Sequence, residues 1–412
     1  MRGAWLIGAT LLAVVAGCAS LAGPGGVPAQ AAAPPEPLPV LAYYYIWFDH
    51  TSWRRAKVDL PSLGRYSSDD REVMRQHVRW AKDAGLRGFI VSWKNTPVLS
   101  RRLEQLVDIA NAEDFKLGII YQGLNFEREP LPVAQIAADL DYFVDRYASD
   151  TTESTNTAFS LFQEPLVIWS GTWEFSREEV ATVAATRRDR LLLLASERNL
   201  EGYRRLADLV DGNAYYWSSV NPDTFRGYPE RLSAMGRAVH DRGGLWIAPA
   251  APGFDARLIG GTRVVERKDG ETLRRQLDAA VRSSPDAVGL ISWNEFSENS
   301  HIEPSETHGR RYLDVVADAL GARPPAVELD SSEPGDTGGS VRYVMLVLGG
   351  FGGLTVAAQA LIVRRRWRDR AARPRPLLGD LERSTGPTGY PTGHPIAHPN
   401  GHLRRGHQEH VR

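Results

Sequence analysis

The chain contains the stretch Val288-Gly-Leu-Ile-Ser-Trp293, continued by Asn294-Glu-Phe-Ser-Glu298, in which a short apolar run directly precedes two carboxylates. An apolar run of this length is typical of a strand that is buried on both faces, as parallel strands are. Runs of the same kind occur earlier in the chain, at residues 41–48, 88–93, 117–123, 166–170, 191–195, 211–217 and 245–250. The sequence therefore predicts a set of buried parallel strands, of which residues 288–293 are the last.

Amphipathic segments of helical length lie between these strands. They cover residues 69–84, 99–112, 132–147, 177–186, 199–209, 224–242, 271–282 and, after the last strand, 309–320. Strands that alternate with helices in this number indicate an α/β fold of the (β/α)8 TIM barrel type. A doubly wound open sheet would usually carry a glycine-rich phosphate turn after its first strand, whereas here the first strand ends in Tyr45-Ile-Trp-Phe-Asp-His50. We therefore expect a barrel over residues 38–322.

The composition of the chain excludes several classes of function. With 412 residues and a formal net charge of −1, the protein lacks the basic excess of a nucleic-acid binder. Its single cysteine, Cys18, leaves no disulfide and no thiolate metal site for the folded part. The 11 Trp and 14 Tyr residues suit a protein that stacks aromatic faces on sugar rings. We predict a monomeric barrel that binds a glycan and needs no metal or other cofactor.

Residues 1–31 have the organisation of a signal peptide. Arg2 precedes an apolar run over residues 4–16, which is too short to span a bilayer but has the length of a signal-peptide core. The segment Val15-Ala16-Gly17-Cys18 resembles a bacterial lipobox, which would leave Cys18 lipidated, and Ala29-Gln30-Ala31 resembles an ordinary cleavage site. The sequence leaves both processing sites open, and residues 32–37 follow as a linker.

A second apolar segment, residues 343–363, carries no charge and has the length of a transmembrane helix. Arg364, Arg365 and Arg366 follow it directly, and basic residues stay on the cytoplasmic side of a membrane. We therefore expect a single-pass protein of the cell membrane whose barrel faces away from the cytoplasm. Residues 323–342 are predicted to form a linker, and residues 364–412 a disordered, basic and His-rich cytoplasmic tail.

The active site of such a barrel is built from the loops at the carboxyl ends of the strands. Aromatic, amide and charged residues recur at these positions, as a site for sugars requires. The predicted substrate-binding residues are Tyr45, Trp47, His50, Trp93, Tyr121, Gln122, Trp169, Tyr216, Asp255, Arg257, Asn294, His301 and Glu303.

Two carboxylates in the loop after the last strand are the predicted catalytic residues. Cleavage of a glycosidic bond needs one carboxyl group that donates a proton and a second that acts as base or nucleophile. Glu295 and Glu298 can supply this pair, and their proximity would raise one pKa, as an acid at neutral pH requires. The alternative is a solvated acidic loop, and the position at the carboxyl end of a barrel strand favours catalysis.

The stretch Ile291-Ser-Trp-Asn-Glu-Phe-Ser-Glu-Asn-Ser-His-Ile-Glu-Pro-Ser305 resembles the W-N-E-W-x-E-G-x-x-I-E-P signature of glycoside hydrolase family 99 and its O-antigen glycosyltransferase-like relatives. It is more distantly similar to the W-N-D-Y-x-E-S-H-Y-I segment of family 71, the α-1,3-glucanases. Three further stretches resemble family 99: Tyr43-Tyr-Tyr-Ile-Trp47, Gly88-Phe-Ile-Val-Ser-Trp93 and Pro252-Gly-Phe-Asp-Ala-Arg257, the last followed by Arg263 and Gly270. The resemblance covers about residues 40–320, the whole predicted barrel.

The resemblance implies a retaining, endo-acting α-glycosidase, typically one that cleaves α-mannosides. It implies that Glu295 removes the proton of the substrate 2-hydroxyl, which then attacks the anomeric carbon to form a 1,2-anhydro sugar. It implies that Glu298 is first the general acid and then the base. The sequence differs from the family at the third strand, where residues 120–123 replace a run that carries a carboxylate, and at Phe296 and Asn299, which replace Trp and Gly of the signature.

Three functions are compatible with this sequence. The first is an extracytoplasmic, membrane-anchored endo-α-glycosidase that acts on a polysaccharide such as α-mannan. The second is a transglycosylase or glycosyltransferase-like protein of glycan assembly, because a retaining site can pass the sugar to a hydroxyl group instead of water. The third is a non-catalytic glycan-binding module, which the presence of both Glu295 and Glu298 disfavours.

Overall fold

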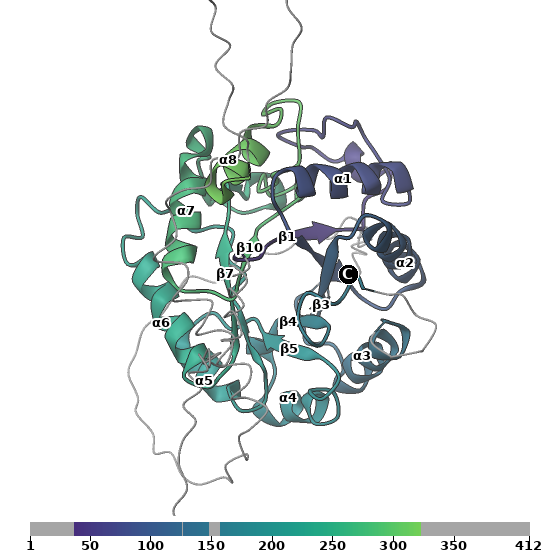
Figure 1. Ribbon diagram of the computed structural model, residues 1–412, viewed down its shortest axis with the longest axis vertical. Coiled ribbons are helices and arrows are strands. Elements are labelled where there is room, and N and C mark those ends of the chain that lie inside the picture. Colours follow the sequence, from purple (N-terminus) through teal and green to yellow (C-terminus); the bar gives the residue numbers. More distant parts are fainter. Residues whose placement is uncertain (1–36, 126, 148–156, 323–412) are drawn as a thin grey trace, which may run out of the picture. The chain divides into compact units, whose positions relative to one another are not determined.

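Eight parallel strands close into a barrel in the part of the chain that the computed structural model describes, residues 37–125, 127–147 and 157–322 (Figure 1). The strands are β1 (Val40–Tyr45), β2 (Gly88–Trp93), β3 (Lys116–Gln122), β4 (Leu166–Ser170), β5 (Leu192–Ala195), β6 (Gly212–Ala214), β7 (Leu245–Ala250) and β10 (Ala287–Leu290). Each strand pairs with its neighbour in sequence, and β10 closes the barrel against β1, with Val288 opposite Val40. The prediction of a (β/α)8 barrel is confirmed.

The helices surround the barrel as an outer ring (Figure 1). They are α1 (Arg71–Asp83), α2 (Pro97–Ala112), α3 (Val133–Tyr147), α4 (Arg177–Ala184), α5 (Leu200–Leu206), α6 (Tyr228–His240), α7 (Glu271–Arg282) and α8 (Arg311–Leu320). Local signals fix several of their starts. Asp70 accepts hydrogen bonds from the N–H groups of Glu72 and Val73, and Ser176 forms a capping box with Glu179 at the start of α4.

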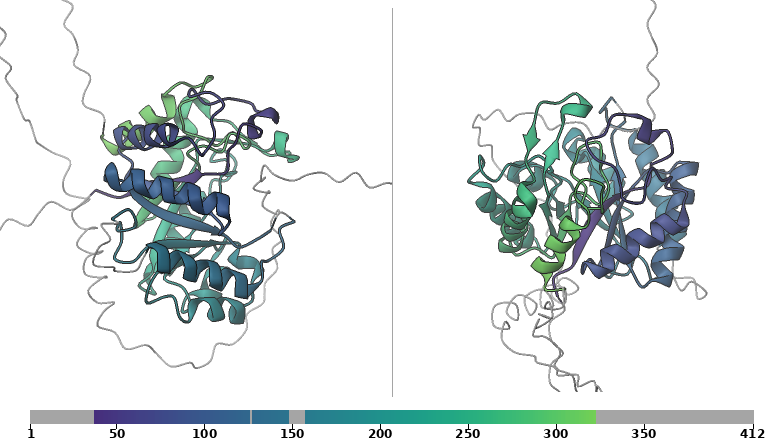
Figure 2. Two further views of the ribbon diagram at one scale, coloured as in Figure 1. Left: turned by 90° about the vertical axis from the view of Figure 1, so that its right-hand side faces the viewer. Right: turned by 90° about the horizontal axis from the view of Figure 1, so that it is seen from above.

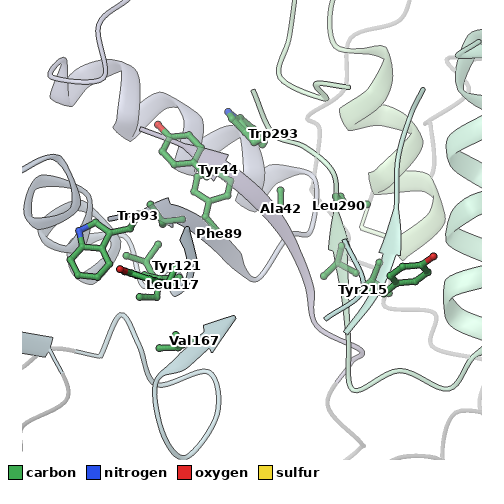
Figure 3. Close-up of a cluster of buried hydrophobic side chains, with 14 of the residues drawn as sticks. Ala42, Tyr44, Phe89, Trp93, Leu117, Tyr121, Val167, Tyr215, Leu290 and Trp293 are labelled. Carbon is green, nitrogen blue, oxygen red and sulfur yellow. The ribbon is translucent and has the colours of Figure 1, made fainter. Parts of the chain in front are cut away.

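Side chains along the strands alternate between two buried layers. Leu41, Tyr43 and Ile90 belong to the cluster inside the barrel, together with Ile120 and Ile168. The intervening residues of the same strands point outward into the larger cluster between the barrel and its helices, part of which Figure 3 shows. Because both layers are apolar, the strands read as continuous apolar runs in the sequence.

Several short elements lie at the ends of the barrel strands, and the side views show them above the strands (Figure 2). An antiparallel hairpin of β8 (Phe254–Asp255) and β9 (Val264–Val265) follows β7. The short 3-10 helices are η1 (Ser52–Arg54), η2 (Thr172–Glu174), η3 (Arg257–Ile259) and η4 (Lys268–Gly270). The sixth strand is shorter than predicted, because Tyr215 and Trp217 leave the strand ladder and pack toward Tyr228 of α6.

None of the helices within the described ranges is both long and apolar enough to cross a bilayer. The predicted signal peptide at residues 1–31, the predicted span at 343–363 and the predicted tail at 364–412 lie outside the described residues.

Candidate active site

The loop that carries both glutamates starts from a fixed point at the carboxyl end of the barrel. The backbone N–H of Trp293 donates to the carbonyl of Tyr43 (2.8 Å), so the chain is still bonded to β1 after β10 ends. The N–H of Glu295 then donates to the hydroxyl of Ser292 (2.8 Å) and turns the chain back on itself. Glu295 and Glu298 therefore extend from a well-supported strand end.

Asn294 joins the first and last strands of the barrel. Its amide oxygen accepts from the N–H of Tyr45 (2.8 Å), and its amide nitrogen donates to the carbonyl of Tyr45 (2.9 Å). Asn294 is fully buried. Its side chain is occupied by the backbone of β1, so it fixes the position of Glu295 and does not face a substrate, contrary to the prediction.

Glu295 is a buried carboxyl group with one unsatisfied oxygen. Only 1% of the residue is exposed, and Oε1 accepts a hydrogen bond from the N–H of Ser297 (3.0 Å). Among the described residues, Oε2 has no hydrogen-bond partner. Burial raises the pKa of Glu295 to about 7, against the opposing charge of Lys57. A group with this pKa and a free oxygen is suited to take up a proton at neutral pH.

Glu298 is also buried, with 3% of the residue exposed. Burial and the charge of Glu295 raise the pKa of Glu298 well above its ordinary value, while the charge of Arg128 acts in the opposite direction. Two neighbouring carboxyl groups that both have a raised pKa, and that lie in different surroundings, can divide the roles of acid and base between them.

Three predicted substrate-binding aromatic residues lie beside this carboxyl pair. The hydroxyl groups of Tyr45 and Tyr216 are hydrogen-bonded to each other, and the charges of Glu295 and Glu298 help to raise the pKa of both tyrosines. The Trp47 ring packs against Tyr45 with 4.3 Å between the ring centroids. The structure thus brings together Tyr45, Trp47 and Tyr216 with the predicted catalytic pair.

Gln122, at the end of β3, faces the interior of the barrel. It lies on the same face of the strand as Ile120, and its amide nitrogen donates to the hydroxyl of Ser92 (3.0 Å). A neutral amide therefore lies at the end of the strand in which the family resemblance implies a carboxylate.

Trp93, Tyr121 and Trp169 lie away from the carboxyl pair, which corrects their assignment to the substrate site. All three belong to the layer between the strands and the helices, and Figure 3 shows Trp93 beside Tyr121. The Tyr121 hydroxyl donates to Asp139 of α3 (2.8 Å), and Trp169 packs on Phe175 with 4.8 Å between ring centroids. Each side chain points to the outer face because strand side chains alternate, and sequence alone does not reveal which alternate set points inward.

Glu303 lies behind the site and bonds to α1 and to the loop before it, not to the barrel interior. Its Oε1 is 3.0 Å from Nε2 of His77 on α1, and its Oε2 accepts from the hydroxyl of Tyr66 (2.9 Å). The His77 and Glu303 side chains are both fully buried. Glu303 therefore supports the loop, and its predicted contact with substrate is corrected.

His301 also supports the loop from behind, which corrects its assignment to the substrate site. Its ring stacks on Phe296 (4.0 Å between centroids), and Arg267 donates to Nδ1 (3.2 Å). Burial, with the charge of Arg267, lowers the pKa of His301 to about 3, so the ring is neutral. Because Arg267 can only donate, Nδ1 accepts and Nε2 carries the proton that His301 donates to Asp59 (3.2 Å).

The remaining predicted site residues lie at the edge of the site. The N–H of Asp255 in β8 donates to the carbonyl of Glu298 (2.7 Å), so the hairpin is attached to the loop of the predicted acid. The Asp255 carboxylate pairs with Arg257 (2.6 Å), whose side chain is 67% exposed. His50 is exposed, and its Nδ1 lies 3.2 Å from the carbonyl oxygen of Arg65.

Two charged residues near Glu295 and Glu298 could not be identified as site residues from the sequence. Lys57 and Arg128 lie in irregular segments after β1 and β3, and their charges act on Glu295 and Glu298 respectively. Such loops have no periodicity from which a position could be inferred. Within the described ranges, no group of three or more His, Cys, Asp or Glu side chains is arranged to hold a metal ion.

Comparison with known proteins gives one family for the barrel. The model of glycosyl hydrolase family 99 matches residues 56–319. The chain is similar to the glycoprotein endo-alpha-1,2-mannosidase-like protein of Danio rerio, at 24% identity over 283 residues, covering 62% of this chain and 61% of the relative. The human protein of the same description is also 24% identical over 283 residues, covering 62% of this chain and 60% of the relative. The chain thus spans about three fifths of the length of these relatives.

Among solved structures, the barrel resembles the family 99 endo-alpha-mannosidase of Bacteroides thetaiotaomicron in complex with bis-tris propane. The TM-score is 0.61 at 20% identity, over 68% of this chain and 96% of that chain. At this sequence identity, the similarity shows that the two proteins share a fold.

Proposed function

Because this chain belongs to glycosyl hydrolase family 99, we propose that its barrel is a retaining, endo-acting α-glycosidase that cleaves a polysaccharide. Membership of the family supports a glycoside hydrolase that acts on glycans. The endo-alpha-1,2-mannosidase-like description of its relatives supports an α-mannoside as the first candidate substrate.

The observation that carries the proposed mechanism is the pair of buried carboxyl groups with different surroundings. With a pKa of about 7, Glu295 is ionised in about half of the molecules at neutral pH. Glu298 keeps its proton, because burial and the charge of Glu295 both favour the neutral form. Glu295 is therefore assigned as the base and Glu298 as the acid.

In the first step, the Glu295 carboxylate takes the proton of the substrate 2-hydroxyl and the oxygen attacks the anomeric carbon. The glycosidic C–O bond breaks as Glu298 donates its proton to the leaving oxygen. In the second step, Glu298 takes a proton from water, whose oxygen attacks the anomeric carbon of the 1,2-anhydro sugar. The bond from the anomeric carbon to the 2-oxygen breaks, Glu295 returns the proton, and two inversions give net retention.

The two buried glutamates also count against a non-catalytic glycan-binding module. Burial of a carboxyl group without a matching partner destabilises the folded state whenever the group ionises. A binding module gains nothing from such a pair, whereas acid–base catalysis requires groups with raised pKa values. Transfer to a sugar hydroxyl uses the same first step as hydrolysis, so it is separated from hydrolysis by the products.

We also propose that the barrel is exported and held at the cell membrane, with the C-terminal tail in the cytoplasm. The apolar run at residues 4–16, the uncharged segment at 343–363 and the arginines at 364–366 support this arrangement. Lipidation of Cys18 would add a second attachment.

The test is an activity screen of the purified chain against α-mannans, α-glucans and arabinans, with analysis of the products. Internal cleavage that gives shorter reducing-end fragments supports an endo-acting hydrolase, and the first-formed product should keep the α configuration. Longer products support transfer. Absence of any cleavage across the panel, by protein that is folded and monomeric, would argue against the proposed activity.

A further inference from the structure

Asn299, the residue directly after the proposed acid Glu298, has a backbone conformation that few residues adopt. Its φ angle is 48°, in the left-handed region. This region is unfavourable for residues other than glycine, although asparagine tolerates it better than most. Such a conformation persists where the surrounding structure holds it, and it is found most often at active sites. The contacts that hold Asn299 therefore also fix the main chain next to Glu298.

Arg267 supplies these contacts. It lies between β9 and η4, and only 7% of the residue is exposed. Its Nη2 donates to the carbonyl oxygen of Asn299 (2.8 Å) and to the side-chain amide oxygen of the same residue (3.3 Å). Its Nη1 donates to the carbonyl oxygen of His301 (2.9 Å). One guanidinium group thus binds main-chain oxygens on both sides of Ser300, together with the Asn299 side chain, and fixes the turn that follows Glu298.

The hydrogen bonds of Arg267 are unusual for a buried cation. The three oxygens above and Nδ1 of His301 (3.2 Å), which accept these bonds, are all uncharged. The Asp59 carboxylate lies one residue further away, where it accepts from Nε2 of His301 (3.2 Å). The guanidinium carbon lies 4.5 Å from the centroid of the Tyr312 ring on α8, which keeps the fork in one plane. Because uncharged acceptors offset the cost of burying a charge only in part, this arrangement indicates a role beyond packing.

The direction of the Glu298 side chain follows from the main chain that carries it. Its carboxyl group has no hydrogen bond to any residue in the described ranges. Its carbonyl oxygen accepts from the N–H of Asp255 in β8 (2.7 Å), and the next residue is the one that Arg267 holds. A general acid must lie within hydrogen-bond distance of the leaving oxygen, and a displacement of about 1 Å can lower a rate about a hundredfold. A change in the conformation of Asn299 would therefore displace the acid.

We propose that Arg267 is a positioning residue for proton transfer by Glu298. It acts through Asn299, whose left-handed conformation it holds, and so directs the acid toward the leaving oxygen. This inference rests on the proposed hydrolase function and adds to it a residue outside the catalytic pair. The presence of Asn299, where the family signature has Gly, agrees with it, because the asparagine side chain gives Arg267 an oxygen that glycine lacks.

The experiment measures how strongly the reaction depends on the leaving group. The full chain is assayed for kcat/KM on an oligosaccharide, with an α-1,2-linked manno-oligosaccharide as the first probe, and on the fluoride of the same glycosyl unit, which needs little protonation to leave. The ratio of the fluoride value to the oligosaccharide value is measured within one variant, so loss of folded protein does not change it. Arg267→Lys keeps the charge and loses the fork that binds two carbonyl groups. Its ratio should rise about tenfold or more, because cleavage of the oligosaccharide depends on a correctly placed acid.

Two substitutions of Asn299 test the conformation itself. Both Asn299→Ala and Asn299→Gly remove the side-chain amide, but alanine disfavours a positive φ and glycine accepts it. Asn299→Ala should raise the ratio, whereas Asn299→Gly should stay near the wild-type value, because Arg267 still holds the carbonyl oxygen. Arg205→Lys is the matched control. Arg205 donates in the same way to the carbonyl oxygens of Phe175 (2.7 Å) and Thr172 (3.1 Å), in the loop after β4, and its replacement should leave the ratio unchanged.

The inference requires a raised ratio in both Arg267→Lys and Asn299→Ala, and an unchanged ratio in either variant overturns it while the hydrolase function stands. Equal losses of activity on the two substrates also refute it, because they show general support of the site and not placement of the acid. If Arg267→Lys does not fold, the contrast between alanine and glycine at position 299 decides. If the wild type cleaves neither substrate, the proposed function fails and this inference falls with it.

Discussion

Replacement of Glu298 by Gln separates the role of this residue as proton donor from any role in binding. Glutamine keeps the shape and much of the hydrogen bonding of the protonated side chain but has no proton to transfer. Glu298 is 3% exposed, and burial with the charge of Glu295 raises its pKa, so in the proposed mechanism the exchange replaces a protonated side chain with a neutral one. Cleavage of a natural glycan, whose leaving group is poor, should fall roughly a hundred- to ten-thousand-fold, or about 3–5 kcal/mol in activation free energy.

The assay uses two substrates with the same sugar and different leaving groups. A nitrophenolate or fluoride leaving group needs little protonation, so the first step on such a substrate should be far less affected in Glu298→Gln. Glu295→Gln is the contrasting variant. It blocks formation of the 1,2-anhydro sugar itself, so activity should fall on both substrates.

Near wild-type rates for both variants on the natural glycan would refute the catalytic pair and favour a solvated acidic loop, since surface substitutions rarely have large effects. Equal losses on both substrates in Glu298→Gln would refute its role as general acid. Equal circular dichroism spectra and melting temperatures at pH 5 show that each variant is folded.

Three further predictions concern pH, packing and topology. The pKa of Glu295 is raised on folding from 4.5 to about 7. Because the ionised form is the base, kcat/KM should fall about tenfold per pH unit below 7. Because the folded protein holds this proton more tightly than the unfolded chain, the free energy of unfolding should decrease as pH rises from about 4.5 through 7. Urea unfolding should therefore show Glu295→Gln to be more stable than the wild type at pH 8, by on the order of 3 kcal/mol, and equal to it at pH 4; a gain that persists at pH 4 would contradict this. Trp93→Ala should lower the free energy of unfolding by about 3–5 kcal/mol, because Trp93 is fully buried, and should leave KM of the remaining folded enzyme unchanged. A raised KM with unchanged stability would show that Trp93 contacts substrate. Protease added to spheroplasts should remove the barrel and spare an epitope on the tail, and digestion of that epitope would rule out the proposed topology.

The barrel could be predicted from the sequence because its strands are continuous apolar runs with amphipathic helices between them. The same continuous apolar runs do not indicate which side chains at the strand ends point into the barrel and which point outward. Ser92 and Trp93 are neighbours on β2, yet one side chain bonds to Gln122 inside the barrel and the other packs in the outer layer. Since both layers are apolar, nothing in the sequence distinguishes the two faces, and the sequence therefore predicts aromatic residues of the outer layer to contact substrate.

The supporting residues were misplaced for a different reason. Glu303 and His301 follow the catalytic loop closely in sequence, which predicts that they lie in the site with it. The chain instead turns behind the loop, where Glu303 reaches His77 of α1 and His301 reaches Asp59. These partners are more than 200 residues away in sequence, with separations of 226 and 242, and no local pattern indicates such contacts.

The hydrogen bonds between Asn294 and Tyr45 connect residues that are 249 positions apart, so they form late, after nearly the whole barrel has been synthesised. The residue that follows Asn294 is the predicted base, Glu295, and the residue it holds is the tyrosine beside that base. A partly made or partly folded chain therefore has neither a closed barrel nor an assembled carboxyl pair. The proposed activity would therefore arise in a single event, when the two ends of the barrel meet, and not gradually as the chain is made.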